Sequence, residues 1–270
     1  MTSSSILNYL LGQFDLFLLV MTALAIVVFI ALYFVDAGYG ILIDKKWGVA
    51  INNKIAWFCM EMPVFLFMTV LFIFSPRIYL FEISTSLVPV IIFLFFQTHY
   101  IRRSFVFPFL LKGKSKMPVT VMFMGVLFNL CNAFMQGGWL FYISPESMYS
   151  INWLWSPQFI LGSILFFGGM SLNIHSDKII LSLRKDGDTK HYLPSKGFFK
   201  YVTGAHYFGE VIEWIGFAIL TWSISGAVFA IWTCANLVPR ANAIYKKYKK
   251  IFGEETIREK GLKRIFPYVY

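Results

Sequence analysis

Carboxylate and amide side chains recur near one end of several apolar segments. In SLNIHSDKIILSLRK, Asn173 and Asp177 are four residues apart and share one helical face, and Arg184 follows them. Glu210 and Glu213, three residues apart, share a face in the same way. Inside an apolar segment such groups are costly unless they are paired, hydrated or used in chemistry. Their position beside loops rich in Lys and Arg predicts a polar site for an anionic cofactor next to an apolar co-substrate.

Other apolar segments carry polar residues toward the same end. They are Glu61 in the second segment, Gln97, His99 and Tyr100 in the third, and the deeper Asn129, Asn132 and Gln136 in the fourth. Glu61 lies between Met residues and a Pro without a charged neighbour, which favours a functional role. Asn129 and Asn132 are also typical of residues that join helices through hydrogen bonds. An interfacial role is an equal alternative for the histidines His99, His175 and His206. His175 points away from the face that Asn173 and Asp177 share.

The elements that position these residues are predicted to be membrane helices. The 270 residues are 58% hydrophobic and 14% charged, with a mean hydropathy of +0.66. This composition is far more apolar than that of soluble domains. Apolar runs occur at about 15–36, 55–75, 86–101, 118–143, 158–177 and 206–245. The last run is twice the length of one span, so a hairpin near Ser223 predicts an all-α polytopic bundle of about seven spans.

Positive charge supports this count. Lys and Arg are frequent in the connections 37–54, 102–117 and 178–205 and in the C-terminal tail, whereas 76–85 holds only Arg77 and the connection after the fourth span holds none. The positive-inside rule then places the N-terminus outside and the C-terminus in the cytoplasm. The net charge of +10 is explained by the orientation of the chain in the membrane, because the Lys and Arg lie in the connections. No nucleic-acid partner is therefore expected. We expect a multi-pass protein of a bacterial inner membrane or the endoplasmic reticulum, with its site open to the cytoplasm.

The chain is expected to form one membrane domain, 1–270. Its three cysteines lie inside apolar runs without ligand-like spacing, so neither a disulfide framework nor a metal site is predicted. The N-terminus lacks the basic region of a cleaved signal peptide, and no internal repeat is present. No Walker A loop or G-x-G-x-x-G motif after a strand occurs, so a nucleotide would be bound by another device.

Long motifs of the chain resemble a known family. LNIHSDKIILSLRK, followed by YLPSKGFFKYVTGAHYFGEVIEWIGFAILTWS, is similar to the C-terminal signature of the steroid 5α-reductases, the 3-oxo-5α-steroid 4-dehydrogenases. The stretch ending in EMP at Glu61 and the stretch QTHYIRRSFVFP also resemble family segments. The similarity covers roughly 55–270, which would be the catalytic and cofactor-binding region, and is weakest in the first span and loop, about 1–54.

The resemblance implies a seven-helix membrane reductase that uses NADPH to saturate the double bond conjugated to the ketone of a 3-oxo-Δ4 steroid. Glu61 and Tyr100 match the catalytic pair of the family, which hydrogen-bonds the ketone oxygen. A donor there would stabilise negative charge as hydride reaches the β-carbon. The cofactor-binding positions are Asn173, Asp177, Arg184, His206, Glu210 and Arg240, with Arg103, Lys112 and Lys114 as phosphate contacts. The substrate would be a steroid or steroid-like lipid entering from the bilayer, and no obligate protein partner is expected.

Several positions depart from the family pattern. Met60 stands where a Gln is common, His206 where an Asn is common, and AIYKKY replaces a His-rich segment. These changes leave the substrate open. A reductase of another unsaturated lipid, such as an enoyl thioester or a polyprenol, is the first alternative. An isoprenylcysteine-type methyltransferase would need S-adenosylmethionine, for which the basic loops are less suited, and a transporter is the non-enzymatic alternative.

Overall fold

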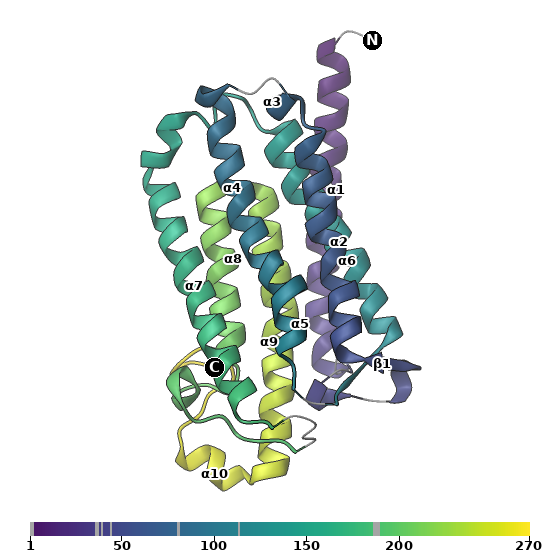
Figure 1. Cartoon of the computed structure of the whole chain (residues 1–270), viewed down its shortest axis with the longest axis vertical. Helices are drawn as coiled ribbons and strands as arrows, with labels where there is room; N and C mark the ends of the chain where they lie inside the picture. The colour runs from purple at the N-terminus through teal and green to yellow at the C-terminus, as the bar shows by residue number, and fades with distance from the viewer. Residues whose placement is uncertain are drawn as a thin grey trace.

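The apolar segments fold as helices. The computed structural model describes residues 3–35, 38, 40–43, 45–79, 82–112, 114–185 and 190–270. Seven long helices in this part of the chain form one elongated bundle (Figure 1). They are α1 (Ser3–Phe34), α2 (Asn53–Ile73), α4 (Ile83–Ile101), α6 (Val119–Gly138), α7 (Pro157–Ser182), α8 (Ala205–Thr221) and α9 (Ile224–Phe252).

Five of the described helical segments are long and apolar enough to cross a membrane, judged by length and composition. These segments are Gly12–Phe34, Asn53–Ile73, Ile83–Leu110, Val119–Ile143 and Pro157–Ser182. Each overlaps an apolar run in the sequence. The protein is therefore α-helical with several apolar helices of membrane-spanning length.

The hairpin expected near Ser223 is confirmed. Helix α8 ends at Thr221, Trp222 takes the left-handed conformation with φ 47°, and α9 begins at Ile224. The Ser223 side chain caps α9, because its Oγ accepts a hydrogen bond from the Gly226 backbone N–H at 3.0 Å. One left-handed residue and one capping serine are thus enough to reverse the chain.

The third span is longer than predicted. The sequence suggested a loop from residue 102, but α4 continues through a π-helical turn, Arg102–Val106, into α5 (Phe107–Leu110). The prediction of a connection over 102–110 was wrong because it ended the apolar run just before Arg102 and Arg103. Both guanidinium groups have protein partners, and the helix continues through them.

The basic connections gather at one end of the bundle, which we call the basic end and which lies at the bottom of Figure 1. There β1 (Ala50–Asn52) pairs antiparallel with β2 (Lys116–Pro118), which links the connection before α2 to the one before α6. After α9, α10 (Glu254–Glu259) turns the chain back. Thr203 and Gly204 then donate backbone hydrogen bonds, each 2.9 Å long, to the carbonyls of Lys263 and Arg264.

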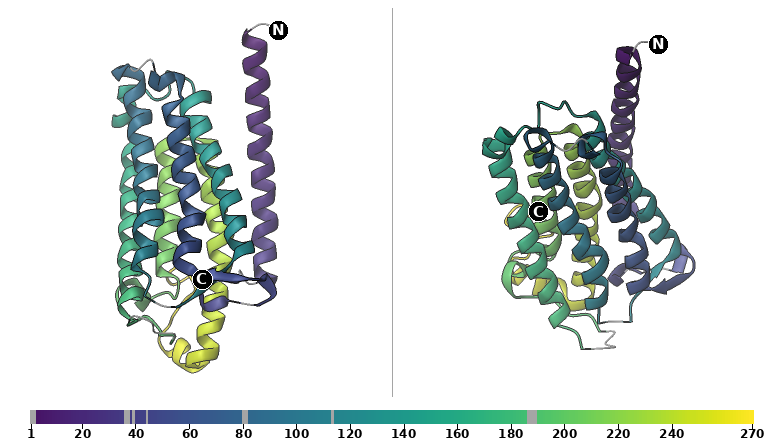
Figure 2. Two further views of the ribbon diagram at one scale, coloured as in Figure 1. Left: turned by 45° about the vertical axis from the view of Figure 1, so that its right-hand side comes forward. Right: turned by 45° about the horizontal axis from the view of Figure 1, so that its top comes forward.

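Helix α1 lies at the edge of the bundle, and its N-terminal end extends past its neighbours in both views of Figure 2. It packs mainly against α9, where the Trp232 indole donates a 2.8 Å hydrogen bond to the Met21 carbonyl. The tight core lies among the other helices and includes Phe96, Phe166 and Trp214, all buried. These helices position the polar residues.

Candidate functional site

Five buried polar residues form a group between α2, α4 and α6, which we call the amide cluster: Glu61, Tyr100, Asn129, Asn132 and Gln136. The Asn129 amide donates hydrogen bonds to the Met60 carbonyl at 2.8 Å and to Glu61 Oε2 at 3.3 Å. The Asn132 amide donates to Tyr100 Oη at 2.9 Å. Each member of the predicted catalytic pair therefore receives an amide donor from α6.

The direction of the bond at Tyr100 has a chemical consequence. Because Asn132 supplies the hydrogen, Tyr100 Oη acts as the acceptor and keeps its own hydrogen for a ligand. Tyr100 is 3% exposed and packs against Phe96 and Trp214, which hold the ring in place. The site thus presents a fixed hydroxyl donor in an apolar setting.

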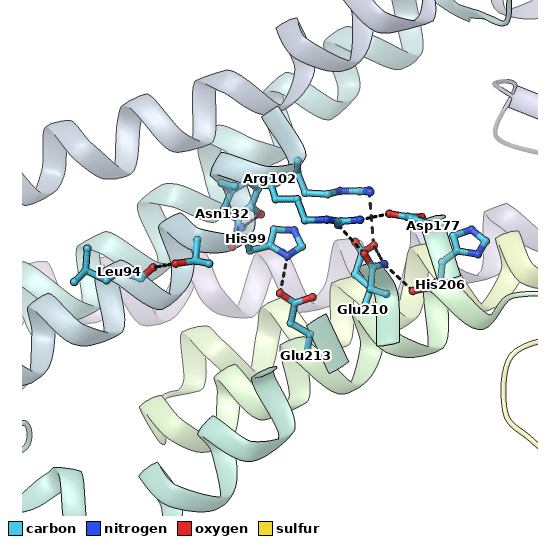
Figure 3. Close-up of polar contacts among 12 residues, drawn as sticks. Leu94, His99, Arg102, Asn132, Asp177, His206, Glu210 and Glu213 are labelled. Atoms are coloured by element: carbon cyan, nitrogen blue, oxygen red, sulfur yellow. Dashed lines mark hydrogen bonds and ion pairs between the residues drawn. The ribbon is translucent and has the colours of Figure 1, made fainter. Parts of the chain in front are cut away.

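A second group of polar residues, which we call the ionic cluster, joins the end of α4 to α7 and α8 on the basic side. It contains Arg102, Arg103, Asn173, Asp177 and Glu210, and Figure 3 labels Arg102, Asp177 and Glu210. The Arg102 guanidinium donates to Asn173 Oδ1 at 2.8 Å and forms an ion pair with Asp177. Arg103 Nη2 lies 3.7 Å from Glu210 Oε2, and the Asn173 amide donates to the His206 carbonyl at 2.8 Å.

The π-helical turn positions the two arginines. A π turn adds a residue to the helical repeat and so changes the direction of the side chains that follow it. The Arg103 guanidinium lies over the rings of Trp57 at 4.8 Å and Phe107 at 5.1 Å. Arg102 lies 5.9 Å from the Phe107 ring. Aromatic faces and carboxylates together make it possible to hold two adjacent cations that are only partly exposed.

His99 and Glu213 form a buried pair beside both clusters. His99 Nδ1 lies 2.7 Å from Glu213 Oε1, and the two side chains face each other in Figure 3. The His99 ring contacts the Trp214 ring edge to face, with centroids 4.6 Å apart. Because Trp214 also packs on Tyr100, the pair supports the wall behind the amide cluster.

Glycines bring α7 and α8 close enough to form the ionic cluster. A Cβ at Gly169 would clash with the backbone nitrogen of Glu213, and one at Gly209 would lie 3.0 Å from the Asn173 Cα. Two turns before Gly169 in α7, Gly162 lies against Gly216 of α8 in the same way, since a Cβ on either glycine would clash with the backbone of the other helix. The absence of side chains at these positions sets the separation at which Asn173 bonds to α8.

The remaining predicted cofactor residues lie around the basic end. Lys112 and Arg184 line one pocket, whose other walls are Leu111, Ser115, Ile180 and Leu181. Arg240 is buried on α9, and its Nε donates a 2.7 Å hydrogen bond to Tyr207 Oη. Lys114 is exposed and lies two residues after Lys112 in the sequence. His206 contributes to the ionic cluster through its backbone carbonyl, which accepts the hydrogen bond from Asn173.

Comparison with known proteins identifies the family. Residues 115–270 match the family described as 3-oxo-5-alpha-steroid 4-dehydrogenase, and this range is more than half of the chain. Steroid 5-alpha-reductase DET2 of Arabidopsis thaliana is 34% identical over 249 residues, 89% of this chain and 90% of the relative. This chain belongs to the 3-oxo-5-alpha-steroid 4-dehydrogenase family. The resemblance carried by the sequence motifs is confirmed, and the chain is an oxidoreductase.

Two mammalian members of the 3-oxo-5-alpha-steroid 4-dehydrogenase family show similar coverage. 3-Oxo-5-alpha-steroid 4-dehydrogenase 1 of Bos taurus is 33% identical over 86% of this chain and 88% of its own length. 3-Oxo-5-alpha-steroid 4-dehydrogenase 2 of Sus scrofa is 35% identical over 89% of this chain and 91% of its own length. The similarity therefore extends over nearly the whole length of each relative.

Within this family member, the structure groups most of the predicted site residues. Glu61 and Tyr100 belong to the amide cluster, and Arg103, Asn173, Asp177 and Glu210 to the ionic cluster. Arg184 and Lys112 share a pocket, and Arg240 of α9 bonds to Tyr207, whose ring packs against the His206 ring. His175 is exposed, as its position off the Asn173 face predicted.

Sequence reasoning missed Arg102, which bonds to two of the predicted cofactor residues. Because its partners lie more than 70 positions away in the sequence, no spacing within its own segment signals this role. The partners of Asn129 and Asn132 were also missed, since both residues were equally consistent with a role in joining helices.

Proposed function

We propose that this protein is a membrane-embedded, NADPH-dependent reductase that saturates the conjugated double bond of a 3-oxo-Δ4 steroid. The observation that carries the proposal is the hydrogen bond from Asn132 to Tyr100 Oη, which leaves the buried hydroxyl to donate to a ketone oxygen. Membership of the family and the names of its relatives support the substrate class.

The residues of the amide cluster suit the charge that develops in such a reaction. When the β-carbon of an enone is reduced, negative charge moves to the ketone oxygen, and a preorganised donor lowers the barrier there. Tyr100 would donate one hydrogen bond to that oxygen. Glu61, buried and bonded to Asn129, would donate a second if it holds a proton. The α-carbon then takes a proton that comes from solvent, which completes the saturation.

The groups around the basic end fit NADPH. Its phosphates need cations, and Arg103, Lys112, Lys114, Arg184 and Arg240 are candidates at this end. Asn173, Asp177, His206 and Glu210 would bind its polar groups. Leu111, Ile180 and Leu181 add apolar contacts beside Lys112 and Arg184 in the small pocket that these residues line. When bound, NADPH supplies the hydride. To bind it, the protein would exchange some of the contacts within the ionic cluster for contacts with the cofactor.

The arrangement in the membrane follows from the same proposal. The five membrane-length helices would span the bilayer together with α8 and α9, giving seven spans. The basic end would face the cytoplasm, and the N-terminus would lie outside. A steroid or steroid-like lipid would then enter from the bilayer, while NADPH would come from the cytoplasm. Neither nucleic acid nor an obligate protein partner is part of the proposal.

The direct experiment uses purified protein in detergent with NADPH and progesterone. We expect consumption of NADPH and formation of the 5α-reduced steroid, measured by absorbance and mass spectrometry. Tyr100→Phe serves as the control protein. If steroids are not reduced but another enone or a polyprenol is, the reaction class holds and the substrate is wrong. Binding of labelled S-adenosylmethionine without NADPH binding would refute the proposal.

A further inference from the structure

Helix α6 presents three amides on one side. Asn129, Asn132 and Gln136 are spaced by three and four residues, so they form a stripe along the helix. All three are buried, with Asn132 0% and Gln136 3% exposed. A buried amide without hydrogen-bond partners would be strongly unfavourable. The partners of each amide therefore determine how its oxygen and its NH₂ group are oriented.

The partner of Gln136 fixes the direction of the hydrogen bonds that follow. Gln136 Nε2 lies 3.0 Å from the backbone carbonyl of Ser225 in the first turn of α9. A carbonyl can only accept, so the NH₂ end of Gln136 must face it. The same NH₂ group lies 3.4 Å from Asn132 Oδ1. The oxygen of Asn132 therefore faces Gln136, and its NH₂ group faces Tyr100 Oη at 2.9 Å.

We propose that Gln136 is a positioning residue for Tyr100, acting through Asn132. The chain Ser225, Gln136, Asn132, Tyr100 has one direction, in which each amide donates toward its neighbour. Without Gln136, the Asn132 amide loses the contact that selects its orientation, and its oxygen can face Tyr100 instead. The Tyr100 hydroxyl would then donate to Asn132 and no longer to a ligand. This inference rests on the proposed role of Tyr100 as the donor to a ketone oxygen.

Gln136 could instead serve only to join α6 to α9 through Ser225. Gln97 provides a matched control for this alternative. It is also 3% exposed, and its amide donates to the Phe65 carbonyl at 3.1 Å and to Thr69 Oγ1 at 2.7 Å. Gln97 thus joins α4 to α2 in the same manner, but its bonds do not lead to Tyr100. A structural role predicts similar effects of the two glutamines.

The test compares Gln136→Met and Gln97→Met in the wild type and in a Tyr100→Phe background. Since a small misplacement of a catalytic group slows a reaction by up to about a hundredfold, we expect Gln136→Met to lower kcat by about tenfold or more. Its NADPH affinity and thermal unfolding temperature should match those of Gln97→Met. In the Tyr100→Phe background, where no hydroxyl remains to orient, Gln136→Met should change kcat by less than about twofold.

Two outcomes would overturn the inference. One is an equal loss of kcat from Gln136→Met in both backgrounds, and the other is an equal loss from Gln97→Met. If Gln136→Met does not fold, Asn132→Leu breaks the same chain one link later and should show the same dependence on Tyr100. A wild type that reduces no steroid refutes the proposed function, whereas an active wild type with a Tyr100-independent Gln136 effect refutes only this inference.

Discussion

The amide cluster and the ionic cluster lie side by side but hold their polar groups in different ways. In the amide cluster, Asn129 and Asn132 donate neutral amide hydrogen bonds to Glu61 and Tyr100. In the ionic cluster, Arg102 is bonded to Asn173 and paired with Asp177. One cluster is thus built from dipoles fixed by helix α6, and the other from opposite charges on three elements.

The difference matches the chemistry proposed for each region. A group that must stabilise developing charge works best when its dipoles are already oriented, since reorientation during the reaction raises the barrier. A site for a polyanion needs cations, and until the ligand arrives these cations need counter-charges if they are buried. We therefore expect the first cluster to control kcat and the second to control cofactor affinity and the stability of the free protein.

The largest effect should come from Tyr100→Phe. Loss of one donor to a developing oxyanion lowers turnover by about 100-fold to 1000-fold, so we expect kcat for steroid to fall by this amount. The NADPH dissociation constant, measured by fluorescence, should change by less than about twofold. The matched control is Tyr149→Phe, because Tyr149 is buried at the opposite end and donates to the Thr221 carbonyl at 2.6 Å. A large loss of NADPH binding in Tyr100→Phe would break the comparison.

The next effect should come from Arg102→Gln, which leaves Asp177 buried with a charge and without its partner. Removal of one member of a buried pair costs several kcal/mol, and partial exposure reduces this to about 2–3 kcal/mol of unfolding free energy. Denaturation in detergent measures it. The double variant Arg102→Gln with Asp177→Asn has no unpaired charge and should recover most of the loss. If the double variant loses as much unfolding free energy as the two single variants together, the ion pair between Arg102 and Asp177 is not the cause of the instability.

Gly169→Ala tests how α7 and α8 position the ionic cluster. The added Cβ meets the Glu213 backbone, so the helices must separate, and we expect a loss of about 1–3 kcal/mol in stability together with weaker NADPH binding. Gly168→Ala is the control, because a Cβ there has no atom within 4 Å. Equal unfolding temperatures for the two variants would contradict the importance of this close contact.

The smallest effect should be the response to salt. Raising the ionic strength from about 0.05 M to about 0.5 M shortens the Debye length several-fold, so the NADPH dissociation constant should rise by a few fold. The affinity for a steroid ligand, which carries no net charge, should stay within about 1.5-fold because salt has no ligand charge to screen. Steroid affinity that falls in parallel with NADPH affinity would show that the two regions do not act separately.

Much of the fold could be predicted from local patterns. The apolar runs marked the long helices, and Ser223 with Gly226 marked the reversal between α8 and α9. The exception is 102–110, where charge alone suggested a loop. The arginines of the π-helical turn there contact Trp57, Asp177 and Glu210, which are far away in the sequence, so local patterns could not reveal these contacts.

The sequence could predict which residues form the candidate site but not which of them bond to one another. Glu61 was conspicuous because an isolated carboxylate in an apolar segment is costly, whereas Asn129 appeared equally suited to joining helices. Their bond connects residues 68 positions apart, and the bond between His99 and Glu213 connects residues 114 positions apart. No periodicity within one helix contains such information.

The sequence by itself determined that the chain forms apolar helices, which end carries the basic connections, and which family it belongs to, because hydropathy, charge and motif are properties of short segments. The tertiary structure decided which polar groups meet. Gly169 and Gly209 allow α7 and α8 to touch, the π turn directs Arg102 toward Asp177, and the Ser225 carbonyl orients the amides that lead to Tyr100. Hydrogen bonds and ion pairs act over a few ångströms, so they exist only after packing has brought distant segments together.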